Sequence, residues 1–261
     1  MSDLTEGRRV YAVGDIHGRL DLLTEMVGRI RADLAARPHP HPLLVFLGDY
    51  IDRGPEVRGV IEALMALRDD ALPARFLLGN HDSYVQAYLD DPDWYDRTYH
   101  WLHENMGGNA TLASYGVPGA SSDRPEETRD AFARAFPKEH MAFIDACEWM
   151  APVGGYLFVH AGIRPGVPLA HQVRDDLIWI REPFLSSERD FGVKVVHGHT
   201  IVPAVEHRAN RIAVDTGAVR TGVLSAVVLE GDRVDLLTPA GPATLPQAPG
   251  APGWRNLWLR R

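Results

Sequence analysis

Five short motifs in this chain combine metal-binding side chains with glycine or another small residue. They read Gly14-Asp15-Ile16-His17-Gly18, Gly48-Asp49-Tyr50-Ile51-Asp52-Arg53-Gly54, Gly79-Asn80-His81-Asp82, His160-Ala161-Gly162 and Gly198-His199-Thr200. Carboxylate, amide and imidazole groups suit hard to borderline divalent cations such as Mn, Fe and Zn. Because the motifs contain no thiolate, they favour a hydrolytic metal centre over a structural zinc site.

The order of these side chains predicts two neighbouring metal ions. Asp15 and His17 fall on the same side of an extended segment, so one ion can take both. Asp49 has the setting of a bridging ligand. The ligands that complete the second site are Asn80, His160 and His199. Two cations roughly 3.5–4 Å apart can clamp the attacking and leaving oxygens of an in-line displacement. No serine or cysteine lies in a nucleophile-like motif, so we predict phosphoester hydrolysis by direct attack of a metal-bridging hydroxide.

Two further pairs accompany the predicted ligands. Asp52 and Arg53 come shortly after Asp49, and His81 comes directly after Asn80. A guanidinium grips phosphate oxygens in a planar, bidentate way, and an imidazole can donate a proton to a leaving alkoxide. A hydrogen bond to Asp52 would fix the orientation of His81. The alternative is that Arg53 and His81 only support the ligands.

Short apolar runs predict the strands that deliver these residues. They cover residues 10–13, 43–47, 76–78, 156–159, 193–196, 212–214 and 224–229. Between the early runs, apolar residues recur at helical spacing over 23–34 and 57–67. Alternating strands and helices imply a largely parallel sheet covered by helices, with the predicted ligands just past the strand ends, where such sheets bind ligands. The last strands have no helices between them, so we expect antiparallel hairpins on a second sheet.

The chain is predicted to fold as one domain over residues 1–240. Residues 84 to about 150 interrupt the alternation and are predicted to form a helical insertion beside the crevice. The aromatic residues of this insertion, interpreted as core rather than as a cofactor site, are Trp94, Tyr95, Tyr99 and Trp101. Residues 241–261 are rich in Pro, Ala and Gly and are predicted to be an extended or partly disordered tail.

Composition narrows the class of protein. The 261 residues carry a formal charge of −8 with dispersed basic residues, which argues against nucleic acid as a partner. The N-terminus lacks the apolar core of a signal peptide, and no run approaches the ~18 apolar residues of a membrane span. We therefore expect a cytoplasmic protein without a membrane partner. The single cysteine, Cys147, lies in an apolar stretch and is predicted to be a buried thiol. The oligomeric state is left open.

Taken together, the motifs resemble the phosphoprotein phosphatase family of metal-dependent serine/threonine phosphatases, within the calcineurin-like metallophosphoesterase superfamily. The hallmarks of that family read GDxHG, GDxxDRG, GNHE or GNHD and a His-Ala/Gly-Gly triplet, and the likeness covers residues 8 to about 220. The chain is similar to the compact bacterial and phage branch. The segments that carry this likeness are Gly-His-Thr, Trp179-Ile180-Arg181-Glu182 and Asp215-Thr216-Gly217.

The resemblance implies an α/β fold of the metallophosphoesterase type, a two-sheet β-sandwich flanked by helices (α/β/β/α) with a helical insertion. It also implies two divalent metal ions, for which Mn is the first choice and Fe or Zn are alternatives. The implied ligands of the first ion are Asp15, His17 and Asp49. Those of the second are Asp49, Asn80, His160 and His199. The implied phosphate clamp is Arg53 and Arg181, and the implied general acid is His81, supported by Asp52.

Two departures from the family pattern bear on these assignments. His197 precedes Gly198, so two histidines compete for one ligand position, and the match to Gly-His-Thr favours His199. The wider superfamily often ends in Gly-His-x-His, whereas this chain has Ile201 at the last position. That difference weakens an interpretation as a nuclease or phosphodiesterase.

We thus predict a dinuclear-metal phosphatase that hydrolyses phosphomonoesters, with phosphoserine and phosphothreonine in proteins as the main substrates. Asp52-Arg53 favours a phosphomonoester, whose extra charge needs a second guanidinium. The nearest alternative is a hydrolase of dinucleoside polyphosphates such as diadenosine tetraphosphate, or a broad small-molecule phosphatase, with insertion aromatics stacking an adenine. A third alternative is a non-catalytic binding module, although every expected ligand, both arginines and His81 are present.

Overall fold

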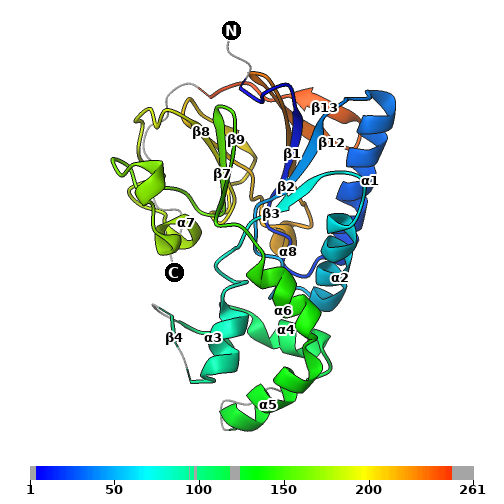
Figure 1. Cartoon of the computed structure of the whole chain (residues 1–261), viewed down its shortest axis with the longest axis vertical. Coiled ribbons are helices and arrows are strands. Elements are labelled where there is room, and N and C mark those ends of the chain that lie inside the picture. The colour runs from blue at the N-terminus through cyan, green and yellow to red at the C-terminus, as the bar shows by residue number, and fades with distance from the viewer. Residues whose placement is uncertain (1–3, 94, 97–98, 118–123, 249–261) are drawn as a thin grey trace.

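Two β-sheets pack face to face between helices in this protein (Figure 1). The computed structural model describes residues 4–93, 95–96, 99–117 and 124–248. The first sheet has six strands in the order β13-β12-β11-β1-β2-β3. Their bounds are Gly241–Thr244 (β13), Arg233–Thr238 (β12), Ala226–Glu230 (β11), Arg9–Val13 (β1), Pro42–Phe46 (β2) and Ala74–Phe76 (β3). Strands β1, β2 and β3 run parallel, whereas β11, β12 and β13 are antiparallel to their neighbours.

The second sheet has five strands in the order β6-β7-β8-β10-β9. Their bounds are Met150–Val153 (β6), Tyr156–Val159 (β7), Lys194–His197 (β8), Arg211–Ala213 (β10) and Glu206–His207 (β9). Strands β7, β8 and β10 run parallel, with β6 and β9 antiparallel at the edges. The parallel strands of both sheets therefore bring their carboxyl ends, and the loops after them, to one side of the molecule.

Three apolar clusters hold these layers together. One lies between the sheets, where Val10 and Val45 of the first sheet share a cluster with Phe158 and Val196 of the second. The outer face of the first sheet is covered by α1 (Leu20–Ala36) and α2 (Val57–Arg68), as Figure 1 shows. The outer face of the second sheet is covered by α7 (Arg174–Trp179) and the segments around the short 3-10 turn Leu169–His171. Each sheet is buried on both faces, which is the arrangement expected of parallel strands.

The helical insertion lies beyond the ends of the strands, in the lower part of Figure 1. Its described residues form four helices and a two-stranded ribbon. Their bounds are Tyr84–Asp90 (α3), Tyr95–Asp96 (β4), Tyr99–His100 (β5), Gly108–Ser114 (α4), Pro125–Ala135 (α5) and Lys138–Asp145 (α6). Its buried Trp101 and Phe132 belong to the same apolar cluster as Tyr11 and Phe46 of the first sheet. The insertion thus shares a core with the sheet instead of forming one of its own.

The predicted fold class is confirmed, since helices flank two sheets of mixed strands. The prediction that the last strands form antiparallel hairpins on a second sheet is confirmed only in part. Strands β8 and β10 do lie in the second sheet, but they run parallel to each other. Strands β11 and β12 form an antiparallel hairpin, but β11 pairs with β1 in the first sheet, with Val10 opposite Leu229. Hydrophobic runs identify strands but carry no information about which neighbour a strand pairs with.

Four strands of the two sheets were not predicted: β6, β9, β12 and β13. They are edge strands or belong to the β12–β13 hairpin at the sheet margin, where short or polar sequences are common. Strand β13 extends the first sheet past residue 240, into the segment predicted as a tail. Residues 249–261 of that segment lie outside the described residues. Among the helices described, none has the length and apolar character needed to cross a lipid bilayer.

Candidate metal centre

The predicted ligands lie in loops that directly follow five strands. Asp15 follows β1, Asp49 follows β2, Asn80 follows β3, His160 follows β7 and His199 follows β8. All five side chains are buried. We call the five motif segments, residues 14–18, 48–54, 79–82, 160–162 and 198–200, the metal rim. The helix α8 (Ala218–Thr221) comes shortly after β10 on the same side.

Two clusters in the metal rim bring together side chains of the kind that bind metals. In one, Asp49 lies with His17 and His81, and in the other it lies with His160 and His199. One carboxylate oxygen of Asp49 is 3.4 Å from His17 Nε2, and the other is 3.4 Å from His160 Nε2. Asp49 therefore presents one oxygen to each cluster, which is the geometry that a bridging ligand needs.

Hydrogen bonds to backbone carbonyls orient two of these imidazoles. His17 Nδ1 donates to Ile51 O at 2.7 Å, and His160 Nδ1 donates to Leu47 O at 2.8 Å. Burial lowers the pKa of both histidines, so they are neutral and their Nε2 atoms carry lone pairs. These lone pairs face Asp49, as in metal sites where the second ring nitrogen is fixed by a carbonyl.

In the second cluster, nitrogen and oxygen atoms that can only accept hydrogen bonds face one another, with no hydrogen between them. His160 Nε2 lies 3.0 Å from Asn80 Oδ1 and 3.4 Å from Asp49 Oδ1. His199 Nε2 is buried and has no hydrogen-bond partner among the described residues. Its ring lies 5.1 Å from that of His160. Burial and then the charge of Arg181 lower the pKa of His199. Converging acceptors of this kind need a cation.

His197 points elsewhere, although it lies only two residues before His199. Its ring packs against Phe184, with centroids 5.1 Å apart, and its Nδ1 lies 3.1 Å from Gly198 O. Strand β8 ends at His197, and the backbone of His199 turns into the left-handed region with φ of 61°. Because of this turn, the side chain of His199 lies in the metal rim beside Asp49 and His160.

Asp15 lies beside the clusters and not within them. Its carboxylate accepts a hydrogen bond from His199 N at 3.0 Å. Burial, followed by the carboxylates of Asp215 and Asp49, raises the pKa of Asp15 well above its usual range. A divalent cation would relieve this repulsion, because opposite charge favours the ionised carboxylate. The assignment of Asp15 as a metal ligand remains a prediction.

The charge of Asp49 is stabilised by its surroundings. Oδ1 of Asp49 accepts a hydrogen bond from the backbone N–H of His81 at 3.0 Å, which favours the ionised carboxylate. Glycines let the carboxylates approach the backbone this closely. A Cβ atom on Gly79 would clash with Oδ1 of Asp49, and one on Gly198 would clash with Oδ1 of Asp15.

The backbone of the metal rim adopts an unusual conformation. Six non-glycine residues have positive φ among those that the structure describes, and five of them lie in the rim. These five are His17, Asp49, Asp52, Arg53 and His199. Such conformations cost of order 1–3 kcal/mol each and persist only where surrounding contacts impose them. Their concentration here marks this loop cluster as the functional site.

Asp82 connects two loops of the rim. Its carboxylate accepts hydrogen bonds from the backbone N–H groups of Asp49, Tyr50 and Gly79, each at 2.9 Å. Burial and the charge of Asp49 raise the pKa of Asp82 to about 8, while these N–H groups act in the opposite direction. Asp82 thus fixes the loop after β2 against the loop after β3.

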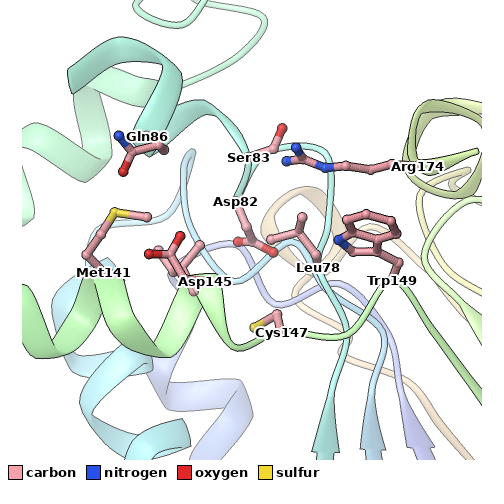
Figure 2. Close-up of a pocket in the computed structure, with 10 residues that line it drawn as sticks. Leu78, Asp82, Ser83, Gln86, Met141, Asp145, Cys147, Trp149 and Arg174 are labelled. Carbon is pink, nitrogen blue, oxygen red and sulfur yellow. The ribbon is translucent and has the colours of Figure 1, made fainter. Parts of the chain in front are cut away.

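Asp82 also lines a cavity of about 140 Å³, with Trp149 and Arg174 at one side (Figure 2). It contains none of the predicted metal ligands. Cys147 lines it as a buried thiol, as predicted, and donates to Phe143 O at 3.4 Å. A second cavity, of about 220 Å³, is lined by His17 and Arg53 of the rim. The side of the metal rim that carries His17 and Arg53 therefore faces the second cavity.

The predicted general acid and its partner are in contact. His81 Nδ1 donates to Asp52 Oδ2 at 2.6 Å, and both residues are buried. Arg53 donates from its two terminal nitrogens to Nε2 of His17 and Nε2 of His81, each at 2.8 Å. Arg181 follows α7 and is exposed, and its charge acts on the centre from that side.

The donor set fits two divalent cations. It combines a shared carboxylate, an amide oxygen and imidazole lone pairs, with one buried imidazole nitrogen otherwise unsatisfied. These are ligands that Mn, Fe and Zn accept.

No role in the site was predicted for four residues around it: Asp82, Asp215, Trp101 and Thr111. Asp215 follows β10 and so obeys the strand-end rule that identified the others. Burial raises its pKa to about 6, and the charge of Asp49 contributes. Trp101 and Thr111 carry no motif, and only the fold brings them to Asp52.

The aromatic residues of the insertion are described in part. Trp101 is buried and packs against Tyr88 and Phe132, with ring centroids at 5.1 and 5.6 Å. The prediction that it belongs to the core is confirmed. Trp94 lies outside the described residues.

Comparison with known proteins gives consistent matches. The family model for calcineurin-like phosphoesterases matches residues 8–237. A symmetrical bis(5'-nucleosyl)-tetraphosphatase of Nitrosospira multiformis is 26% identical, covering 86% of this chain and 94% of that protein. The asymmetrical bis(5'-nucleosyl)-tetraphosphatase PrpE of Geobacillus thermodenitrificans is 26% identical, covering 91% and 95%. The solved structure of a cold-active protein-tyrosine phosphatase from Shewanella matches with a TM-score of 0.64 and 18% identity, covering 91% and 80%, and shares the fold.

Proposed function

This chain belongs to the calcineurin-like phosphoesterase family and is a phosphoester hydrolase, and we propose that its substrate is a dinucleoside polyphosphate. The observation that supports this choice is the pair of relatives named bis(5'-nucleosyl)-tetraphosphatases, each matched over nearly its whole length. Such a substrate is a chain of phosphates between two nucleosides. Its hydrolysis breaks a bond between phosphorus and a bridging oxygen.

Two groups of residues would hold the metal ions. The proposed ligands of the first ion are Asp15, His17 and Asp49. Those of the second are Asp49, Asn80, His160 and His199. When bound, Mn or a similar divalent ion supplies Lewis acidity at the phosphoryl group and a more acidic water. The chain itself supplies the shared carboxylate of Asp49 and imidazoles whose orientation is fixed by backbone carbonyls.

Arg53 and Arg181 would bind the phosphoryl oxygens. A guanidinium offers parallel N–H donors that match two phosphate oxygens. The terminal nitrogens of Arg53 donate to His17 and His81 in this structure, so the same donors lie within the rim. Arg181 comes two residues after the end of α7, the helix that covers the second sheet.

His81 would donate the proton that the leaving oxygen needs. In the donor form, Nε2 of His81 carries a proton and no longer accepts the hydrogen bond from Arg53. The proton passes to the leaving oxygen as that oxygen takes the electron pair of the broken P–O bond, and the imidazole becomes neutral. Asp52 remains a carboxylate throughout and holds Nδ1 of His81.

A second candidate substrate, phosphoserine or phosphothreonine in a protein, is favoured by the Asp52–His81 pair itself. The alkoxide that leaves from a phosphoserine is strongly basic, so protonation assists its departure. A departing nucleotide phosphate, with a second pKa of about 6, needs far less assistance. A buried proton-donating pair is therefore more useful for a phosphomonoester of an alcohol.

The test is product release by metal-stripped enzyme reconstituted with Mn. Diadenosine tetraphosphate and phosphoserine or phosphothreonine peptides are compared at equal concentration, with Asp49→Asn as the inactive control. A kcat/KM larger by orders of magnitude for the dinucleotide supports the proposal. The reverse ranking assigns the same centre to protein phosphoesters. No activity on either substrate, with metal bound, would overturn both.

A further inference from the structure

The insertion holds the turn that carries Asp52 and Arg53. Trp101 Nε1 donates to both carboxylate oxygens of Asp52, at 2.9 and 3.0 Å. The Thr111 hydroxyl donates to Asp52 Oδ1 at 2.6 Å and accepts from Asp52 N at 3.0 Å. The carbonyl of Gly107 accepts from Arg53 N at 3.1 Å. Both residues of the turn have positive φ, and the insertion satisfies the backbone N–H of each.

These contacts fix the plane of a buried carboxylate. Asp52 is 0% exposed, and its Oδ2 accepts from His81 while its Oδ1 accepts from Thr111. Trp101 bonds to both oxygens and so limits rotation of the carboxylate about its own axis. A buried carboxylate with fewer donors would be costly and free to turn.

The two donors are themselves held rigidly. The Trp101 ring is 0% exposed and packs against Tyr88 of α3 and Phe132 of α5. Thr111 is also 0% exposed and belongs to α4. The orientation of Asp52 therefore depends on three helices of the insertion, none of which contains a predicted metal ligand.

We infer that Trp101 and Thr111 are positioning residues, which orient Asp52 and, through it, the proton-donating Nε2 of His81. This inference rests on the proposed role of His81 as the proton donor. The insertion then contributes to the reaction without touching the phosphoryl group. A substitution that lets the Asp52 carboxylate rotate leaves the metal ligands in place, but Nε2 of His81 no longer points at the leaving oxygen.

The test uses substitutions that remove one hydrogen and keep the shape. Trp101→Phe removes the indole N–H and keeps an aromatic ring, and Thr111→Val removes the hydroxyl. Thr111→Ser restores the hydroxyl without the methyl group. Matched controls are Trp149→Phe, at an indole that is 53% exposed, and Thr128→Val, at a buried threonine of α5.

Each variant is loaded with Mn and assayed with phenyl phosphate and p-nitrophenyl phosphate. Both are phosphomonoesters, but nitrophenolate departs with little protonation, whereas phenolate needs more. For Trp101→Phe and Thr111→Val we expect kcat on phenyl phosphate to fall about tenfold, with kcat on p-nitrophenyl phosphate within about twofold of the parent. KM and Mn content stay unchanged, and Thr111→Ser recovers most of the lost kcat.

Equal losses on both substrates in the two folded variants, or loss of Mn, would overturn the inference, because that pattern indicates a purely structural role. His81→Asn in the same assays separates this failure from failure of the proposed function. If His81→Asn lowers both rates equally, His81 is not the proton donor. If His81→Asn separates the substrates while Trp101→Phe and Thr111→Val do not, only the positioning role is wrong.

Discussion

The metal rim and the helical insertion (residues 84–145) lie against each other but are built in opposite ways. The rim places five non-glycine residues in left-handed conformations and buries carboxylates and imidazoles together. The insertion has only glycines with positive φ among its described residues, and its interior is aromatic. The metal rim keeps strained backbone conformations and buried charged groups that can bind ligands. The insertion contributes the stability of an ordinary apolar core. The strained turn at Asp52 is stable because the relaxed helices of the insertion hold it.

The strongest test of this contrast is the shared carboxylate. We expect Asp49→Asn to lower kcat by about 10³-fold or more, because it removes the charge that both metal clusters share, a loss comparable to an oxyanion-hole donor or larger. Mn content, measured by atomic emission, should fall in parallel. In the insertion, Phe132→Leu should cost only about 1 kcal/mol of unfolding free energy.

Metal content should be unchanged in Phe132→Leu, because this residue contacts none of the predicted metal ligands through a ring or hydrogen-bond contact in the described residues. If this variant loses metal as readily as Asp49→Asn, the two regions are one cooperative unit and the contrast is wrong. Thermal melts of both proteins with bound Mn identify any variant that is simply unfolded.

A second test compares two histidines that are two residues apart. His199 faces the rim and His197 packs against Phe184. We expect His199→Asn to lower kcat by about 10²-fold and to weaken binding of one Mn ion, in line with the loss of a ligand or of its orienting partner. The same substitution at His197 should reduce thermal stability and leave the Mn stoichiometry intact. Loss of one Mn from His197→Asn, with full binding in His199→Asn, would reverse the assignment.

The leaving group gives a third test, with an effect limited to substrates whose leaving oxygen needs a proton. We expect His81→Asn to lower kcat by about 10²-fold on phosphoserine peptides, which need a proton on the departing oxygen, and only a few-fold on p-nitrophenyl phosphate. Diadenosine tetraphosphate should behave like p-nitrophenyl phosphate, because its leaving phosphate is weakly basic. Stopped assays with equal Mn loading measure all three rates. Equal losses on the three substrates would place His81 in the metal site.

Much of the rim could be predicted from sequence because its determinants are local. Each ligand follows a short apolar strand, and strand ends meet at one edge of a parallel sheet, so Asp15, Asp49, Asn80, His160 and His199 are expected to converge. The motifs also identified the superfamily, which is confirmed, whereas the serine/threonine phosphatase branch remains a prediction.

The rest could not be predicted because it depends on contacts between distant segments. Trp101 and Thr111 lie 49 and 59 residues after Asp52, and no periodicity relates them to it. The pairing of β11 with β1 spans most of the chain, with Arg9 opposite Glu230. The direction of His197 depends on where β8 stops, and strand ends are the least certain part of a sequence pattern. The preference for His199 therefore came from the match to Gly-His-Thr and not from the strand pattern.

The smallest expected effect concerns the pH dependence of the insertion. Burial lowers the pKa of His140, and its Nδ1 lies 2.8 Å from the Tyr115 hydroxyl. The folded protein therefore holds His140 neutral at a pH where the unfolded chain, with a pKa of about 6.5, already binds a proton. Its contribution to stability is complete above that pH and is lost as the pH falls below it.

We expect His140→Asn to reduce this loss, because the amide cannot titrate and its oxygen can accept the hydrogen bond from Tyr115. Between pH 7 and pH 5, proton uptake on unfolding should fall by a fraction of a proton relative to the parent. Urea unfolding of the Mn-loaded proteins at several pH values measures this difference, with Thr128→Val as a control in the same insertion. The kcat per bound Mn at pH 7 should not change, since α6 contains no residue of the rim. A pH dependence identical to that of the parent would mean that the insertion does not contribute to acid sensitivity, which would then arise in the rim alone.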